Sequence, residues 1–511
     1  MELGQIYFGK SDAKNEVLTN SPEELERFTA AFVEPPALSV KKFQDREKYF
    51  IVGPKGTGKT ALLRYVSAKL DKEEDGHSSF ILFKSEIDED LKKEFAKAAR
   101  VQVTQENSDD FAGEDFEQVW RWFTYRKIAA AVVDNPIEPF QKTADLNSFI
   151  AIVNSEDFGN QEPSGIFKLI PKIRKGKIEI SKSPMLGLEF DWDDSGKAKV
   201  DFGYLVRQAD TAFEKLIPNT SRLNIFFDEL ELNYGTSKQH TRDSWLVRDL
   251  IVTVEKINAT CKKKGFPICL YAAIRSEVLN SVDSLGKEIN KPLFDFGSII
   301  KWNSPNVGDN EQPLLEIVVR RINNARTASG LTELIASEIW ETYFPDLILG
   351  KYAAQEFILH NSWYRPRDIV RLLSTAQDQY PIEKSFRRQT IENVRRQFSQ
   401  DSWVEMTEEL KANYKPSEIS GIKNILYGFK RRFNLGDLTV HAAQVAENYA
   451  DTAKLLEKHQ IKIIASDLYR VGILGNINED GKHRFSFRGD ENILYGQMLF
   501  LHIALRPTLS L

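Results

Sequence analysis

Residues 49–60 of the chain read Tyr49-Phe50-Ile51-Val52-Gly53-Pro54-Lys55-Gly56-Thr57-Gly58-Lys59-Thr60. The apolar start of this stretch predicts a short buried strand. The turn after it fits the phosphate-loop pattern G-x-x-x-x-G-K-[ST] at every specified position. A helix beginning Ala61-Leu62-Leu63-Arg64-Tyr65 is predicted directly afterwards. Strand, glycine-rich loop and helix in this order predict an α/β protein built on the parallel sheet of a P-loop NTPase.

The residue types of this loop suit the phosphates of a nucleotide. Glycines let backbone N–H groups close around an anion, and the helix that follows offers its unpaired N-terminal amides. Lys59 is predicted to reach the β- and γ-phosphates, and the Thr60 hydroxyl to bind Mg²⁺. The expected cofactors are therefore ATP and Mg²⁺. The predicted nucleotide contacts are Gly53, Pro54, Lys55, Gly56, Thr57, Gly58, Lys59, Thr60 and Ala61.

A second informative stretch is an apolar run, residues 223–227, that ends in Asp228-Glu229. Such a run is typical of a buried parallel strand whose carboxyl end meets a nucleotide. Asp228 is the candidate Mg²⁺ ligand, and Glu229 is the candidate group that activates the attacking water. Any strand can end in acidic residues, so this interpretation depends on the complete phosphate loop upstream. The long separation from Lys59 predicts an inserted region, at about residues 86–205.

A third apolar run, residues 266–274, ends in Arg275-Ser276. In P-loop ATPases with an added strand between the two nucleotide-binding strands, that strand ends in a polar residue that senses the γ-phosphate. Arg275 or Ser276 is a candidate for this role, and Arg275 is counted as a candidate catalytic residue. The alternative is an arginine that only ends a strand.

Composition limits the classes of protein to which the chain can belong. Its 511 residues are 41% apolar and include 69 basic and 74 acidic residues, a net charge of −5, so any binding of nucleic acid or membranes requires a local patch. Two cysteines give no disulfide framework, and the seven histidines show no metal-ligand spacing. Neither a secretion signal nor an apolar run of about 18 residues is present. We therefore expect a soluble, cytoplasmic protein without membrane contact.

Two regions contain basic residues that nucleic acid could contact. A predicted β-hairpin at residues 170–192 has acidic neighbours, which favour an ordinary solvated face. Near the C-terminus, a helix over 461–471 and a hairpin over 475–488 predict a winged helix, and Asp467 among its basic residues favours protein contact over DNA. The basic residues of the first region are Lys168, Lys172, Arg174, Lys175, Lys177 and Lys182, and those of the second are Lys462, Arg470, Lys482, His483, Arg484 and Arg488.

These motifs in this order, together with Trp363-Tyr364-Arg365-Pro366-Arg367-Asp368 and the opening Phe8-Gly9-x-x-Asp12-Ala13, resemble a known group. The chain is similar to bacterial P-loop ATPases of the AAA+/STAND group, including relatives of the KAP and origin-recognition types. Members are often encoded in mobile-element or antiviral-defence loci. The resemblance implies that Arg365 or Arg367 senses the γ-phosphate from a helical lid, whereas the alternative for Arg367 is a surface residue beside Asp368. It also implies an arginine finger among Arg320, Arg321 and Arg326.

The predicted organisation has four parts: an N-terminal arm (1–48), the P-loop core (49–305), a helical lid (306–400) and a winged-helix-like domain (401–511). The first functional hypothesis is an ATP-hydrolysing switch that controls a partner effector, plausible in antiviral defence. The second is a DNA-binding loader or remodeller that grips duplex DNA with its winged helix. Expected partners are ATP and a second copy of the chain or a separately encoded effector, with nucleic acid left open.

Overall fold

The computed structural model describes residues 1–511 except 18, 20, 74–75, 88, 91, 94, 97–115, 135–136, 157–168, 175–176, 184, 187, 189, 231–236, 283–286, 412 and 491. Lys168 and Lys175 of the predicted basic stripe therefore lie outside the described residues. The chain divides into two compact units. The sheet unit comprises Ala37–Lys55 and Lys59–Ile300, and the helical unit comprises Met1–Pro36, Gly56–Gly58 and Lys301–Leu511. The four-part division expected from the sequence stays a prediction beside this grouping.

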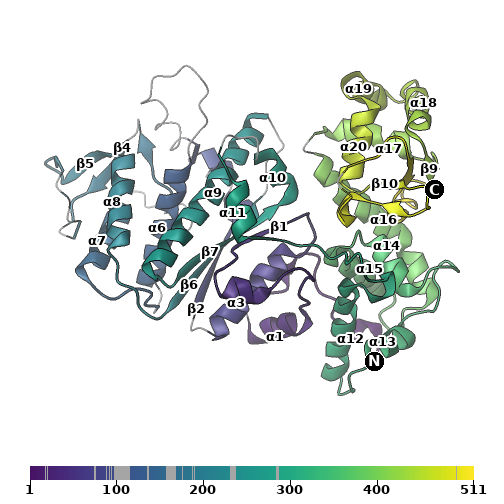
Figure 1. Ribbon diagram of the computed structural model, residues 1–511, viewed down its shortest axis with the longest axis horizontal. Coiled ribbons are helices and arrows are strands. Elements are labelled where there is room, and N and C mark those ends of the chain that lie inside the picture. Colours follow the sequence, from purple (N-terminus) through teal and green to yellow (C-terminus); the bar gives the residue numbers. More distant parts are fainter. Residues whose placement is uncertain are drawn as a thin grey trace. The chain divides into compact units, whose positions relative to one another are not determined.

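A five-stranded parallel sheet forms the centre of the sheet unit (Figure 1). Its strand order is β2-β6-β7-β1-β8, so the strand ending at Arg275 lies between the phosphate-loop strand and the strand with Asp228. The strands in this order are β2 (Gly76–Leu82), β6 (Arg222–Leu230), β7 (Ile268–Arg275), β1 (Phe50–Gly53) and β8 (Gly297–Ile299). The three central strands are almost entirely buried, which explains their continuous apolar runs. The predicted α/β class and parallel sheet are confirmed.

Helices pack on this sheet through apolar side chains at helical spacing. Helix α3 contacts β1, β2, β6 and β7 and buries Leu62, Leu63, Val66 and Leu70, and α9 packs on β7. The helices that complete this part are α2 (Val40–Gln44), α3 (Lys59–Glu73), α4 (Phe83–Glu86), α9 (Ser237–Lys264), α10 (Ser276–Val282) and α11 (Asn290–Phe296). Because α3 starts at Lys59, the sheet and this helix together fix the phosphate loop at its two ends.

Among the residues that the structure describes, the predicted insertion includes three helices and a small antiparallel sheet. The sheet pairs β4 (Lys177–Ser181) with β5 (Lys197–Asp201) and with the two-residue strand β3 (Ile173–Arg174). In the β4–β5 pair, Lys177 lies opposite Asp201 and Glu179 lies opposite Lys199. Positive and negative residues therefore alternate on the same face. This balance favours a solvated face over a nucleic-acid stripe. The helices are α6 (Glu117–Asp134), α7 (Ala144–Val153) and α8 (Phe202–Glu214).

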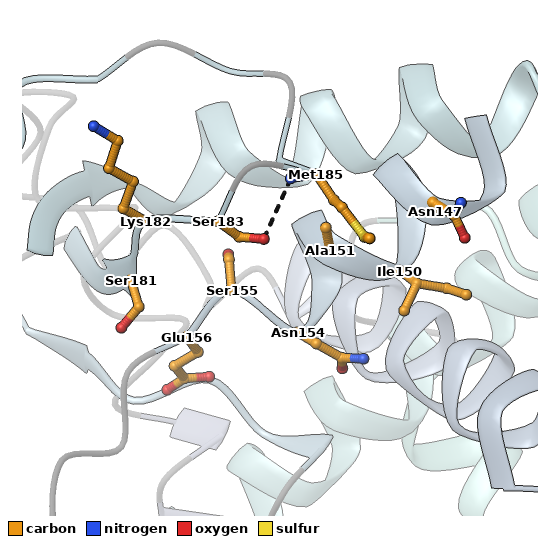
Figure 2. Close-up of a pocket in the computed structure, with 10 residues that line it drawn as sticks. All are labelled: Asn147, Ile150, Ala151, Asn154, Ser155, Glu156, Ser181, Lys182, Ser183 and Met185. Carbon is orange, nitrogen blue, oxygen red and sulfur yellow. Dashed lines mark hydrogen bonds between the residues drawn. The ribbon is translucent and has the colours of Figure 1, made fainter. Parts of the chain in front are cut away.

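A hollow of about 330 Å³ lies between α7 and the end of β4. Figure 2 shows Met185 beside Ala151 and Ile150 on one side, whereas the Lys182 ammonium points away from them. Glu156 at its edge is buried and forms an ion pair with Arg126 at 2.8 Å. Because the lining residues all come from the insertion, this hollow is separate from the predicted phosphate site.

The helical unit contains two sets of helices and a four-stranded antiparallel sheet. The first set is α1 (Pro22–Ala31), α12 (Glu316–Ala328), α13 (Ala336–Tyr343), α14 (Ala354–Asn361), α15 (Pro366–Gln379) and α16 (Arg388–Leu410). The second is α17 (Pro416–Leu426), α18 (Leu435–Ala446), α19 (Ala450–Lys458) and α20 (Ile461–Arg470). Helix α1 has a well-formed start, since the Ser21 hydroxyl accepts a hydrogen bond from Glu24 N and Pro22 is the first helical residue.

The C-terminal sheet is larger than the hairpin predicted from the sequence. Its order is β11-β10-β12-β9, with β10 (Leu474–Ile477), β11 (His483–Arg484), β12 (Met498–Leu501) and the edge strand β9 (Arg432–Phe433). The predicted second hairpin strand stops at Arg484, and Ser486–Arg488 instead form a 3₁₀ turn. The strands β9 and β12 escaped prediction because each is very short or lies beyond the hairpin in the sequence. No helix in the described part of the chain is long and apolar enough to cross a membrane.

Candidate nucleotide-binding site

The phosphate loop joins β1 to α3 and turns through two left-handed glycines. Gly56 has a φ of 82° and Gly58 a φ of 95°, values that residues with a Cβ rarely adopt. The Lys59 ammonium is buried and donates hydrogen bonds of 2.8 Å to Gly53 O and to Pro54 O. These contacts hold the positive charge against the loop's own backbone, beside the amides at the N-terminus of α3. The loop therefore combines a cation and N–H donors, as phosphate binding requires.

A β-bulge shapes the carboxyl end of β6. The pairing with β7 shifts register between Phe227 and Leu230, and Glu229 within the bulge has a φ of 57°. Left-handed backbone costs a non-glycine residue about 1–3 kcal/mol and is concentrated at functional sites. The bulge turns Asp228 and Glu229 out of the regular alternation, so two consecutive carboxylates can serve one site.

Asp228 is the most informative carboxylate of the site. Its side chain is buried, and its Oδ1 accepts a hydrogen bond of 2.8 Å from Glu229 N. Thr60 also hydrogen-bonds this carboxylate, which joins the strand to the start of α3. Burial raises the pKa of Asp228 above its usual value, and Oδ2 has no hydrogen-bond partner among the described residues. An unpaired, buried carboxylate oxygen next to a threonine hydroxyl fits a hard cation such as Mg²⁺.

Glu229 has a polar partner that the sequence analysis did not identify. The Ser85 hydroxyl lies in α4, directly after β2, and donates a 2.6 Å hydrogen bond to Glu229 Oε2. The two residues meet because β2 is the parallel neighbour of β6, with Leu82 opposite Asp228. The available signal in the sequence was a serine shortly after the apolar run at residues 80–83.

Arg275 occupies the strand position expected for a γ-phosphate sensor. It ends β7 and stands opposite Gly53 in the β1–β7 pairing, so it lies at the same edge of the sheet as the phosphate loop. Its side chain is half-buried. Ser276, the alternative candidate, begins α10. The position suits either role considered above, a phosphate sensor or a strand end.

The arginines of Arg365-Pro366-Arg367 are held by carboxylates of α16. Arg365 Nη1 lies 3.2 Å from Glu409 Oε1, and Arg367 Nη1 lies 2.8 Å from Glu405 Oε1. Within the helical unit, which includes Gly56, the Arg367 backbone N is also 3.5 Å from Gly56 O. The arginine pair is therefore next to the tip of the phosphate loop, with both side chains engaged by a neighbouring helix.

The backbone immediately before this motif is strained. Trp363 and Tyr364 have φ angles of 47° and 52°, which are outliers for such bulky residues. The Trp363 ring stacks on His502 with the centroids 4.0 Å apart, and its Nε1 donates to Gly472 O at 2.9 Å. Tyr364 donates its hydroxyl to Asp309 Oδ1 at 2.8 Å. These contacts hold the turn that sets the direction of Arg365 and Arg367.

The three finger candidates also have partners within the helical unit. Arg320 forms an ion pair with Glu316 at 3.1 Å and donates to Phe32 O at 2.6 Å. Arg321 is buried and forms an ion pair with Glu16 at 3.1 Å. Arg326 donates to Thr332 O and to the Tyr343 hydroxyl. Burial makes Arg321 the least suited of the three to reach another subunit, so Arg320 and Arg326 remain the accessible candidates.

Comparison with known families agrees with this geometry. Residues 17–233 match the family model described as ORC-CDC6-like, a span that includes the phosphate loop and the Asp228–Glu229 bulge. This segment is similar to the P-loop ATPases of the origin-recognition type. The resemblance to the origin-recognition type inferred from the sequence is thereby confirmed for this span. Arg275 lies beyond the ORC-CDC6-like span.

A second family model covers part of the helical unit. Residues 312–407 match the FunZ-associated C-terminal helical domain, and this span contains Arg365, Arg367 and Glu405 but ends before Glu409. Among solved structures, the crystal structure of Cdc6p from Pyrobaculum aerophilum aligns with 93% of this chain and 93% of its own, at 11% identity and a TM-score of 0.33. No curated protein matches the chain significantly.

Proposed function

We propose that the chain is an ATP-hydrolysing molecular switch that controls a separate effector protein. The observation that carries the proposal is the Asp228–Glu229 bulge, joined to the first turn of α3 through Thr60. A protein that only binds nucleotide needs the loop and its lysine. A second carboxylate, turned out of the strand at a cost in backbone strain, adds a candidate base for water.

In this proposal each residue has a distinct role. Lys59 exchanges its two backbone carbonyl partners for the β- and γ-phosphates. Thr60 and Asp228 hold Mg²⁺, whose bound charge neutralises the phosphate oxygens. Glu229 accepts a proton from the attacking water, and Arg275 and Arg367 are proposed sensors of the γ-phosphate.

The Ser85 hydrogen bond gives the proposed switch a resting state. A carboxylate that accepts a 2.6 Å hydrogen bond from a hydroxyl is restrained in position, and one of its oxygens is already engaged. We propose that Glu229 leaves Ser85 when nucleotide and partner are bound. The effector, the antiviral setting and assembly with other copies of the chain belong to this proposal and rest on the resemblance.

We propose a protein as the partner because basic residues of the predicted winged helix, Arg470, Arg484 and Arg488, are already bound by neighbouring side chains. Arg484 forms an ion pair with Asp490 at 2.8 Å, and Arg470 forms one with Asp467 at 3.2 Å. Arg488 donates to the Tyr364 hydroxyl at 3.1 Å and stacks over its ring. Neutralised cations release fewer counterions from a phosphate backbone, which weakens the alternative of a wing that grips duplex DNA.

The test compares two variants with a matched surface control. Lys59→Ala should abolish binding of labelled ATP. Glu229→Gln should bind ATP as tightly as the parent and lose at least about 100-fold in turnover, the scale of a lost general base. Glu214→Gln, at an exposed glutamate of α8, should leave both properties unchanged. Normal turnover by Glu229→Gln would show that the proposed base is wrong. Sizing the parent with and without ATP then tests the switch itself, which requires a change in assembly state or shape.

A further inference from the structure

Four arginines of the helical unit lie together and form no ion pair with the acidic residues that the structure describes. They are Arg395 of α16, Arg431 and Arg432 at the edge strand β9, and Arg506 after the last strand, and we call them the arginine cluster. None forms an ion pair with a residue that the structure describes, in contrast to the paired arginines of the wing and of the Arg365-Pro366-Arg367 motif. Arg431 and Arg432 are exposed, whereas Arg395 and Arg506 are half-buried.

Backbone pairing brings these residues together. Leu501, at the end of β12, donates its N–H to Arg431 O at 3.0 Å. The carbonyl of the same residue accepts from Arg506 Nε at 3.3 Å and Nη2 at 3.2 Å. Arg432 stands one position further along β9, opposite Phe500. Because Leu501 contacts both segments, the Arg506 guanidinium is anchored beside the edge strand that carries the two exposed arginines.

Helix α16 supplies the fourth arginine. Ser399, one helical turn after Arg395, accepts a hydrogen bond of 3.0 Å from Thr508 N, two residues beyond Arg506. This contact fixes the C-terminal segment on the face of α16 that carries Arg395. Burial lowers the pKa of Arg506 below its usual value, and the nearby charges of Arg431, Arg432 and Arg395 lower it further. Burial also lowers the pKa of Arg395; the charge of Glu392 acts in the opposite direction, and the charge of Arg431 lowers the pKa further.

The acidic residue closest in sequence, Glu392, interacts with the charge of Arg395 but forms no ion pair with it. Glu392, three residues before Arg395, accepts from Arg388 Nε at 2.8 Å and from Leu349 N at 2.7 Å. Tyr352, beside both Arg395 and Arg506, adds a hydroxyl that can donate to an anion. The site therefore offers guanidinium donors, a phenol and excess positive charge.

We propose that the arginine cluster and Tyr352 form a second anion site, separate from the phosphate loop, that binds a phosphate group. Guanidinium groups match the oxygens of a phosphate in geometry and charge, often two bonds at a time. The half-buried Arg506, anchored to Leu501 O, and the half-buried Arg395 would hold the group beside the two exposed arginines. A bound dianion would also remove the mutual repulsion of the four cations. The ligand is inorganic phosphate or the phosphomonoester of a small molecule.

The test is calorimetric titration of the full-length protein with inorganic phosphate. It is done in the Lys59→Ala variant, so that the phosphate loop does not contribute and the result is independent of the proposed ATPase mechanism. We expect one equivalent of phosphate to bind, and binding to weaken at least tenfold when Arg431→Gln and Arg432→Gln are added. The control pair Lys454→Gln and Lys482→Gln removes the same two charges from exposed sites elsewhere and should leave phosphate affinity within twofold.

Further measurements separate the sources of the ligand and check the fold. Competition by ribose 5-phosphate at equal or lower concentration supports a phosphomonoester, and its failure to compete supports free phosphate. The Gln pair should have an unchanged or higher unfolding temperature without phosphate, because exposed like charges have been removed. The proposal is overturned if no equivalent of phosphate binds or if the Gln pair binds it as the control pair does. It is equally overturned if only a duplex oligonucleotide binds and depends on these arginines, which would make the cluster a nucleic-acid surface.

Discussion

Asp228→Asn should make the nucleotide-free protein more stable while it removes magnesium-dependent nucleotide binding. The Asp228 carboxylate is buried, and one of its oxygens has no hydrogen-bond partner among the described residues. Its raised pKa means that the folded state disfavours the charged form. The native protein therefore binds this proton more tightly than the unfolded chain, whose carboxyl has a pKa near 3.8. The resulting penalty is absent below that value, grows as the pH rises through the folded-state pKa and is complete above it.

The magnitude follows from the unpaired oxygen. An unsatisfied buried polar group costs about 1–3 kcal/mol, and more when it is charged. Asparagine removes the charge but leaves a buried amide nitrogen in the same place, so we expect a net gain of about 1 kcal/mol. In a unit of this size that corresponds to a rise of about 2–4 °C in the unfolding temperature. The gain should disappear in acid, where the parent carboxyl is itself neutral.

The assay is thermal unfolding at several pH values, with and without Mg²⁺-ATP. Asp368→Asn is the matched control, because Asp368 is equally buried and also has a raised pKa from burial. It differs in its ion pair with Arg371 at 2.8 Å, and breaking one partner of a buried pair costs about 3–5 kcal/mol. Asp228→Asn should therefore stabilise and Asp368→Asn destabilise. A destabilised Asp228→Asn protein, or one that Mg²⁺-ATP still stabilises as it does the parent, would refute the reasoning.

Three further outcomes are expected. Ser85→Ala should raise basal ATP turnover by up to about tenfold, because Glu229 would no longer be held by a hydrogen bond that is worth about 1.5–3 kcal/mol. Turnover as low as that of Glu229→Gln would contradict the proposal that Ser85 restrains Glu229. Arg365→Ala should lower the unfolding temperature because it removes the buried Arg365 guanidinium from its 3.2 Å ion pair with half-buried Glu409, whereas Arg367→Ala should chiefly lower turnover. Equal losses of stability would contradict this distinction. Burial lowers the pKa of His502 well below 6.5, so the free energy of unfolding should fall as the pH drops below that value. His502→Phe should make stability less dependent on pH below 6.5, and an unchanged pH dependence would exclude His502 as its cause.

The elements that the sequence predicted well are those in which local pattern and function coincide. The glycines of the phosphate loop are needed for left-handed backbone, and the apolar run before Asp228 belongs to a strand buried on both faces. Both requirements can be recognised in a short stretch of sequence, as glycine spacing in one case and as an apolar run in the other. The Arg275 strand was placed correctly between its neighbours because parallel strands with helical connections follow few topologies.

Other features depend on contacts between distant residues. Ser85 and Glu229 are 144 positions apart and meet only because β2 is paired with β6. The carboxylates that hold Arg365 and Arg367 come from a helix whose pattern gave no sign of a specific role. The four arginines of the cluster are scattered over three elements, two of which are only a few residues long. Such sites depend on the pairing of short strands and on contacts between a helix and the C-terminal segment. Neither kind of contact produces a periodic pattern in the sequence.

The left-handed turn at Trp363 and Tyr364 has a consequence for dissecting the protein into fragments. A piece that ended near residue 407, the limit of the matched helical domain, would lose Gly472, His502 and Arg488, all of which contact these two aromatic residues. The turn would then relax toward ordinary backbone angles and release its strain, and the arginines after it would point elsewhere. Measurements of sensor function on such a fragment would describe a rearranged loop, so the C-terminal residues are part of the smallest piece in which that motif can be studied.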